Sequence, residues 1–524
     1  MQTATAHVRP PGYETRWRGL IFIGVSLIVI SLDNTVLNVA LPSIARTLNA
    51  SASELQWIID AYVLVFAALL LTTGALGDRI GRKKALQAGL LLFGLGSLAA
   101  ALSTSTAMLI AARAFLGIGG AMIMPATLSI VSATFPLEER PQAIAIWAAV
   151  FGLGVGIGPV VGGWLVERFA WRSVFYVNLP VIVVALIGGY LFLAESRDEH
   201  APRPDIPGVL LSIVGLFALI YAIIEAGVKG WGDPMVIGAF VLAFVVLSAF
   251  IVWERRTAQP MLPMHFFKNM SFTGANLALV FISFSLFGAV FFLTQYLQTI
   301  HGYTAFEAGV RILPQAISLT LMASYSARIA RRIGTRNAIA LGIFISCIGM
   351  LYMSFVLDVD TPYPLIALGQ VIMTTGLGIA ISPATNSVMA SVPVRQAGVG
   401  SAMNDTTRQL GGAIGIAVLG TILNSTYIAG VAGLREQVPA NLFEMIQSSV
   451  QRAHLVAANP ETSSQLADTI LRVSNEAFMA GMSNALLVAG LVMAGAALFT
   501  LLALPKRVQA SAAPASPAPA VVGD

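Results

Sequence analysis

The sequence predicts an all-α integral membrane protein, and three observations support this fold class. Only 10% of the 524 residues are charged while 57% are hydrophobic, and the mean hydropathy is +0.81. A soluble domain carries roughly 25% charged residues, so a water-soluble globular protein is excluded. Apolar stretches long enough to cross a bilayer as helices follow one another along the chain. Lys and Arg residues gather in alternate loops, as the positive-inside rule requires of a multi-pass protein.

Fourteen apolar stretches of this kind are present, so we predict fourteen transmembrane helices. The first stretch is too long for the apolar core of a signal peptide and is expected to remain as a helix. The approximate spans are 20–42, 56–76, 85–103, 107–131, 141–165, 173–193, 207–226, 235–253, 272–297, 308–327, 338–357, 363–391, 400–425 and 482–504.

The loops on the side of the two termini hold most of the 30 Lys and Arg residues. An even number of spans puts both termini on one side, and the positive-inside rule makes that side the cytoplasm. We therefore expect a multi-pass protein of the cell's inner or plasma membrane. The net charge of +5 is explained by this loop pattern, so a lipid bilayer and not a nucleic acid is the expected partner.

Several function classes are excluded by what the sequence lacks. The single cysteine, Cys347, rules out an intrachain disulfide, and the five histidines are too widely separated for a metal site. No paired nucleophile and base is evident, so we expect no enzyme activity, no metal and no cofactor. The sequence also contains no G-x-x-x-x-G-K-[ST] phosphate loop, which leaves an ion gradient as the energy source for any transport.

Ionised groups inside a membrane span are costly and indicate function. Asp33 lies near the middle of the first span, where a carboxyl group that is costly to ionise can bind and release a proton. Arg113 in the fourth span must find a carboxylate or a hydrated cavity, either as a functional group or as a structural ion-pair partner. Asp60 and Glu225 lie near the non-cytoplasmic interface, where a wetted boundary charge and a substrate contact are equal alternatives.

In the thirteenth span, Asp405 and Arg408 are three residues apart, a spacing at which helical side chains meet. We expect them to form an ion pair. In the ninth span, Phe281, Phe284 and Phe287 follow one helical stripe with Phe291. This stripe either offers an aromatic wall to a flat cation or faces lipid.

After the second span the chain reads GALGDRIGRKK, residues 74–84. Its glycines allow a tight turn and close helix contact. Asp78 can accept hydrogen bonds from a neighbouring helix N-terminus, while the basic side chains clamp helix C-termini or carboxylates. The sequence closely resembles the signature loop of the major facilitator superfamily, which implies a cytoplasmic gating loop. The residues assigned to it are Gly74, Asp78, Arg79, Gly81, Arg82 and Lys83.

A degenerate copy of this loop, ARIARRIGTR at 327–336, follows the tenth span and has Arg331 in the place of Asp78. Two such loops indicate a duplicated architecture. We therefore predict the major facilitator fold, with two six-helix bundles at 20–193 and 272–504 and an inserted helix pair at 207–253. The remaining segments are a cytoplasmic N-terminal segment (1–19), an extracytoplasmic amphipathic helical hairpin (428–478) and a disordered cytoplasmic tail (505–524).

Further motifs resemble one branch of the superfamily, the fourteen-spanner drug:proton antiporters. They are LDNTVLNVALP at 32–42, LIAARAFLGIGGA at 109–121, GVGIGPVVGG at 154–163, WRSVFYVNLP at 171–180, DIPG at 205–208 and NDTTRQLGG at 404–412. The motif at 154–163 resembles the one associated with antiporters of the superfamily, and its residues Gly154, Gly158, Pro159, Gly162 and Gly163 are expected to pack helices closely. Export as the direction of transport is implied by this resemblance.

The resemblance implies a monomeric, proton-coupled exporter that expels lipophilic, cationic drugs or antibiotics by alternating access. An exporter or proton symporter of an endogenous metabolite, antibiotic, siderophore or lipid is the alternative. An importer would share the fold but should lack the 154–163 motif. A sensor without transport should tolerate Asp33→Asn without any change in proton flux.

Overall fold

The computed structural model describes residues 12–48, 50, 52–198, 205–460 and 462–505, and this part of the chain is helical with no strand. Thirteen of its helices or helix pairs are long and apolar enough to cross a membrane. A fourteenth, α11, is 29 residues long but more polar, since it includes Glu307, Arg311 and Gln315. The all-helical fold class is therefore confirmed, and each predicted span has its helix.

The helices fall into an N-terminal and a C-terminal half with a helix pair between them. The N-terminal half contains α1 (Arg16–Leu48), α2 (Ala52–Ile80), α3 (Arg82–Ala101), α4 (Thr106–Thr134), α5 (Arg140–Arg168), the short α6 (Ser173–Tyr176) and α7 (Asn178–Phe192). The pair is α8 (Ile206–Lys229) and α9 (Pro234–Arg256). The C-terminal half contains α10 (Met270–Gln295), η3 (Tyr296–Ile300), α11 (Ala305–Ile333), α12 (Thr335–Val356), α13 (Tyr363–Ala390), η4 (Val394–Gln396), α14 (Ala397–Val431), α15 (Ala440–Ser448), α16 (Val450–Ala457) and α17 (Ser464–Ala503).

Contacts between the halves run mainly along two helix pairs, α5 with α11 and α2 with α14. Within the halves, α4 packs on α2 and α3, α1 packs on α5, and α13 packs on α11 and α12. Two halves joined along a few helices form an interface that can open on one side while it closes on the other.

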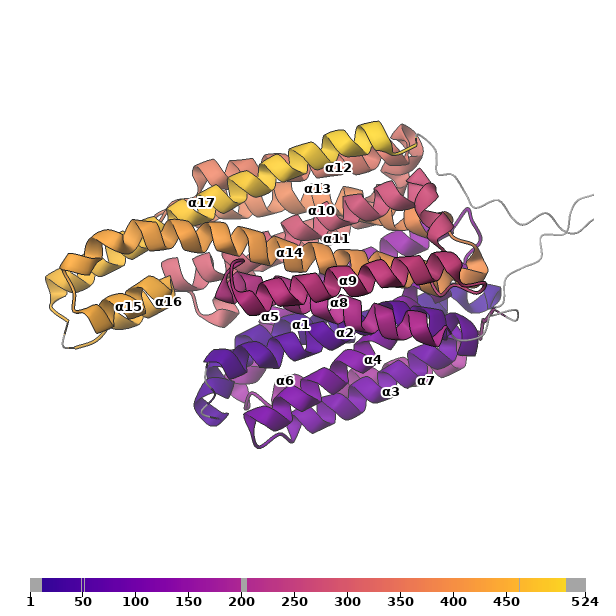
Figure 1. Ribbon diagram of the computed structural model, residues 1–524, viewed down its shortest axis with the longest axis horizontal. Coiled ribbons are helices and arrows are strands. Elements are labelled where there is room, and N and C mark those ends of the chain that lie inside the picture. The colour runs from indigo at the N-terminus through magenta and orange to yellow at the C-terminus, as the bar shows by residue number, and fades with distance from the viewer. Residues whose placement is uncertain (1–11, 49, 51, 199–204, 461, 506–524) are drawn as a thin grey trace, which may run out of the picture.

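The pair α8–α9 lies across the front of the molecule between the indigo N-terminal half and the orange C-terminal half (Figure 1). Only α8 makes extensive contact with the halves, through α2 and α14. Asp205 joins the pair because its Oδ1 caps α8 at the Gly208 amide, 3.0 Å away, and accepts the indole N–H of Trp253 on α9 at 2.7 Å. The apolar side chains of α9 are largely exposed and suit contact with lipid.

The segment 428–478 differs in part from the prediction. A helical hairpin is present, but it is only α15 and α16, because α14 continues to Val431 and α17 already begins at Ser464. Both long helices extend past the rest of the bundle, where the hairpin lies beside them (Figure 1). Gln451 of the hairpin donates to Gln295 at 2.9 Å, and the Tyr427 hydroxyl donates to the Ile446 carbonyl at 2.8 Å.

Some predicted boundaries move and others cannot be compared. The first helix begins at Arg16 and not at residue 20, and a 3-10 turn from Tyr13 precedes it. The predicted tail lies outside the described residues from 506 onward, as do residues 1–11 of the N-terminal segment.

Candidate transport site

Asp33 and Arg113 form an ion pair inside the N-terminal half. The Arg113 Nη1 lies 2.5 Å from Asp33 Oδ2, and both side chains are 2% exposed. Arg113 also donates from Nε to the Ile58 carbonyl of α2 at 3.0 Å. Its guanidinium carbon lies 4.5 Å from the centre of the Tyr62 ring. The pair therefore ties α1 and α4 together against α2.

Asparagine and serine side chains complete the polar cluster on its other side. Asn178, the first residue of α7, donates from Nδ2 to Asp33 Oδ1 at 3.2 Å and to Ser97 Oγ of α3 at 2.9 Å. The motif 171–180 thus supplies a contact to Asp33 that sequence reasoning did not assign. The hydroxyl of Tyr62 has no hydrogen-bond partner among the described residues.

The molecule also contains a central cavity of about 160 Å³ between the two halves. Its walls come from α1, α5, α10, η3, α11, α13 and α14. Most of the lining is apolar or glycine, and the polar side chains in it are Thr35, Thr294, Gln298, Gln315 and Arg408.

Asp33, the proton-binding candidate of the sequence analysis, does not line this cavity. The α1 residues that do line it are Thr35 and Val39. Since successive residues of an α-helix turn by about 100°, Asp33 and Thr35 point to nearly opposite sides of α1. Arg113 is likewise absent from the lining. The structure separates the buried ion pair from the cavity by the width of one helix.

Asp60 and Glu225 also lie away from the cavity lining. Glu225 pairs with Lys229 one turn along α8, with 2.7 Å between Oε2 and Nζ. Asp60 is half-buried on α2 and accepts a hydrogen bond from the Gln56 side chain. Neither acid contacts the cavity, and the boundary-charge alternative stays a prediction.

The predicted ion pair between Asp405 and Arg408 is not formed. Within the described residues Asp405 Oδ1 accepts from the Asn404 side chain at 3.1 Å, and Asp405 Oδ2 and Arg408 Nη1 have no hydrogen-bond partner. The Arg408 guanidinium instead reaches from α14 to α5, where it lies 4.6 Å from the centre of the Phe151 ring. Helical spacing allowed the pair, but the aromatic rings of the other half attract the arginine.

The phenylalanine stripe on α10 does not form a cavity wall. Phe284 and Phe287 pack against α14 at Gly415 and Gly412, and Phe291 is exposed. The α10 residues that do line the cavity are Leu286, Val290 and Thr294. The aromatic side chain in the lining is Phe151 of α5, which the sequence analysis did not single out.

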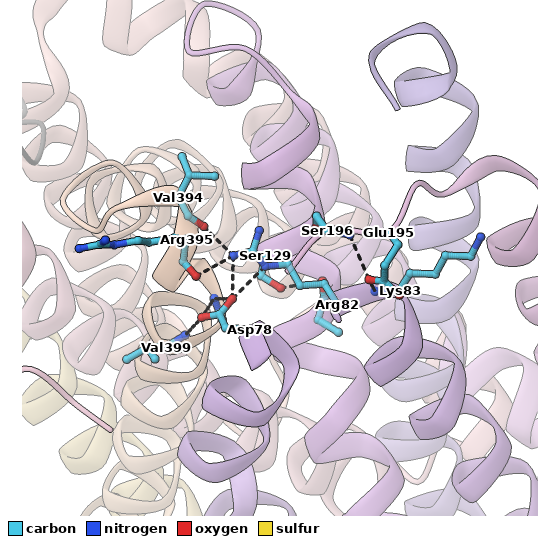
Figure 2. Close-up of polar contacts among 11 residues, drawn as sticks. Asp78, Arg82, Lys83, Ser129, Glu195, Ser196, Val394, Arg395 and Val399 are labelled. Atoms are coloured by element: carbon cyan, nitrogen blue, oxygen red, sulfur yellow. Dashed lines mark hydrogen bonds and ion pairs between the residues drawn. The ribbon is translucent and has the colours of Figure 1, made fainter. Parts of the chain in front are cut away.

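The predicted loop at 74–84 is helical except at Gly81, which separates α2 from α3, and its side chains contact the C-terminal half (Figure 2). Asp78 accepts hydrogen bonds from the Gly398 amide at 2.8 and 2.9 Å and from the Val399 amide at 3.2 Å, at the N-terminus of α14. Arg82 donates to Asp78 at 2.7 Å and to the Val394 carbonyl of η4 at 2.6 Å. We call these contacts the latch.

Two glycines allow the close contacts at and beside the latch. A Cβ on Gly74 would lie 2.5 Å from the Gly398 carbonyl oxygen. Gly81 has a φ of 116°, which side chains rarely adopt, and a Cβ there would meet the Glu195 carboxylate. Glu195, just after α7, accepts the Lys83 amide at 3.1 Å. Arg79 is exposed at the surface.

The degenerate copy has the same turn without the same contacts. Gly334 separates α11 from α12 with a φ of 86°, as Gly81 separates α2 from α3. Among the described residues, the side chain of Arg331 makes no ion pair or hydrogen bond. The described part of the chain thus has a latch of this kind on α2 and α14 and no second one on α11.

Helix α5 packs closely on both of its neighbours through the motif at 154–163. On one side, a Cβ on Gly154 or Gly158 would overlap the hydroxyl oxygens of Ser31 and Thr35 on α1. On the other side, a Cβ on Gly163 would lie 3.0 Å from Phe306 of α11. The remaining packing residues of the motif are Gly162 against Val36 and Pro159 against Gly309.

We expect Gly158→Ala to destabilise the protein by roughly 1–3 kcal/mol, because the added methyl group overlaps Thr35 Oγ1. Adding Thr35→Ala should recover part of the loss. Thermal unfolding in detergent measures both effects. Gly238→Ala is the matched control, since nothing lies within 4 Å of a Cβ at that position of α9. Equal melting temperatures for Gly158→Ala and Gly238→Ala would contradict this packing.

Comparisons with known proteins agree with this architecture. The family model described as Major Facilitator Superfamily matches residues 23–416. The tetracenomycin C resistance and export protein of Streptomyces glaucescens is 32% identical, over 96% of this chain and 95% of its own. The multidrug efflux pump LfrA of Mycolicibacterium smegmatis is 35% identical, over 92% of this chain and 95% of its own.

Solved structures show the same fold at low identity. The proton:xylose symporter XylE matches with a TM-score of 0.62 at 12% identity, over 95% of this chain and 98% of its own. The human organic anion transporter MFSD10 matches with a TM-score of 0.57 at 14% identity, over 93% of this chain and 100% of its own. These two likenesses concern the fold alone.

Proposed function

This chain belongs to the major facilitator superfamily, and from that premise we propose that it is a proton-coupled exporter of drugs or antibiotics working by alternating access. Relatives of this chain are named as multidrug and antibiotic efflux proteins, which supports a drug exporter. The observation that carries proton coupling is the buried Asp33–Arg113 pair behind the cavity face of α1.

Protonation of Asp33 would remove the negative partner of a buried arginine. Breaking a buried ion pair in this way costs about 3–5 kcal/mol, so the contact between α1 and α4 must rearrange. Thr35 and Val39 move with α1, and they line the cavity. Protonation of Asp33 on one side of α1 therefore changes the substrate site on the other side. Proton binding and substrate binding then oppose each other, because each favours a different position of α1.

The latch supplies the second element of the cycle. It holds α2 against α14 through charged hydrogen bonds. At the second contact between the halves, the glycines of α5 let α11 pack closely. In our proposal the latch end faces the cytoplasm, with both chain termini on that side. Releasing the latch admits the substrate from the cytoplasm, and restoring it precedes release outside.

The driving force is sufficient for uphill export. One charge moved through a potential of 100 mV supplies about 2.3 kcal/mol, which corresponds to roughly a fiftyfold concentration ratio. Asp33 is the proposed proton carrier, with Arg113 as its partner. Asp60 and Glu225 have no assigned step, since neither contacts the pair or the cavity lining.

The proposal is tested with purified protein in liposomes that carry an imposed pH gradient. We expect added tetracenomycin C to be transported and to dissipate the gradient, and protein-free liposomes to show neither effect. Transport at the same rate with no pH gradient and no membrane potential would overturn proton coupling. Uptake in place of export in oriented vesicles would overturn the direction.

A further inference from the structure

The cavity presents two buried polar atoms without a hydrogen-bond partner in the part of the chain that the structure describes. Arg408 Nη1 and Gln315 Oε1 lack hydrogen-bond partners among the described residues. The two residues are only 7% and 4% exposed, and both line the cavity. Buried polar groups are normally paired, and leaving one unpaired is costly. A ligand that forms hydrogen bonds with both atoms would remove this cost.

The chemistry of the two atoms is opposite. Arg408 can only donate hydrogen bonds and carries a permanent positive charge, whereas Gln315 Oε1 can only accept. Gln315 lies on α11 and Arg408 on α14, so both come from the C-terminal half. A ligand that satisfies both atoms carries an acceptor oxygen for the arginine and an N–H or O–H donor for the glutamine.

Aromatic rings of the other half hold the arginine in place. Its guanidinium carbon lies 4.6 Å from the Phe151 ring centre and 5.8 Å from the Trp147 ring centre, both on α5. Stacking on ring faces leaves the N–H groups at the guanidinium edge available for planar oxygen acceptors. Phe151 also lines the cavity and offers a flat surface next to the arginine.

The charges of the lining favour acceptors over cations. Arg408 is the charged residue among the described lining residues, and no carboxylate lines the cavity. Asp405 is buried on the same helix but is not part of the lining. A lipophilic cation would meet a positive charge in this cavity and no facing negative one, which makes its binding unfavourable.

We infer that the substrates are flat aromatic compounds bearing a carboxylate or phenolate oxygen, which binds Arg408, and a donor group, which binds Gln315. This inference rests on the proposed function, since it takes the cavity as the substrate site. It replaces the cationic preference expected from the sequence, because the acids and the phenylalanine stripe behind that expectation lie outside the lining. Arg408 is then the residue that determines specificity for the charge of the substrate.

The test compares the binding of two dyes that differ in one group. Rhodamine 19 carries a free carboxylate, and rhodamine 6G is its ethyl ester, a cation with the same ring system and the same N–H donors. Fluorescence anisotropy with the purified full-length protein measures both dissociation constants without a proton gradient. We expect wild type to bind rhodamine 19 at least about tenfold more tightly, as a charged hydrogen bond allows.

Variants assign the preference to the two side chains. Arg408→Gln should abolish the difference between the dyes, and Arg408→Lys should retain a preference for the acid. Gln315→Leu should weaken both dyes without changing their ratio, because both carry the donor groups. Arg472→Gln is the control, since Arg472 is exposed on α17 and pairs with Glu476 at the surface. Melting temperatures identify any variant that fails to fold.

Equal or tighter binding of rhodamine 6G by wild type would overturn the inference, as would an unchanged preference in Arg408→Gln. Either result can occur together with normal proton-driven export, in which case the proposed function stands. Preferential binding of rhodamine 19 without any proton-coupled movement of substrate would overturn the proposed function instead.

Discussion

Asp33→Asn is expected to abolish proton-driven export. An amide has nearly the size of the carboxyl group and can still accept a hydrogen bond from Arg113, but it cannot carry a proton. The substitution also leaves the buried charge of Arg113 without its counterion, at a cost of about 3–5 kcal/mol. We therefore expect a lower melting temperature together with the loss of substrate-dependent collapse of a pH gradient in inverted vesicles.

The double variant Asp33→Asn, Arg113→Gln separates the two effects. Removing both charges leaves a neutral pair that can still bond across α1 and α4, so most of the lost stability should return. Export should remain absent, because no proton carrier is restored. Asp60→Asn is the matched control, since Asp60 is an acid of the same half that contacts neither Arg113 nor the cavity lining.

Two results would remove Asp33 from the mechanism. One is an identical collapse of the gradient in wild type and Asp33→Asn. The other is recovery of proton-driven export in the double variant, which would mean that the buried pair serves only to hold the helices.

Asp78→Asn is expected to release the latch and open the interface between α2 and α14. The neutral amide weakens the bond to Arg82 and can no longer accept all the hydrogen bonds that the carboxylate receives from Gly398 and Val399. Hydrogen bonds to charged groups contribute about 1.5–3 kcal/mol each, so the loss of one lowers the ratio of closed to open molecules by at least about tenfold.

Cysteine labelling measures this opening. Ala402 is buried against Gly74 in the latched interface, and Cys347 can be replaced by serine so that Ala402→Cys is the single thiol. A maleimide should label this thiol at least about ten times faster in the Asp78→Asn background. Lys84→Gln is the control, because its side chain is exposed. Equal labelling rates with and without Asp78→Asn would show that these hydrogen bonds do not hold the interface closed.

The helices and the latch were predictable because their signals are local. Spans follow from length and hydropathy, and the turn at Gly81 follows from the need for a positive φ. The acceptor role of Asp78 toward a helix N-terminus also followed from its chemistry, although its partner is 320 residues away in the sequence.

Orientation of side chains was the part that the sequence did not determine. Asp33 and Thr35 are two residues apart, and nothing local says which of them faces the other half. Arg408 was assigned to Asp405 by helical spacing, whereas Phe151 and Trp147 from α5 provide the competing contact. Gln315 was missed, although an amide inside a predicted span is a signal of the same kind as Arg113.

Helix α14 runs without an interior proline through 35 residues, a length of roughly 52 Å at 1.5 Å per residue. The amides of its first turn bond Asp78, Arg408 lies about a third of the way along it, and the Tyr427 hydroxyl near its far end bonds the hairpin. When α14 moves as a rigid body, its contact with Asp78, its cavity residue Arg408 and its contact with the hairpin move together. A displacement of α14 caused by ligand binding in the cavity therefore moves both of its ends directly, without a chain of side-chain contacts.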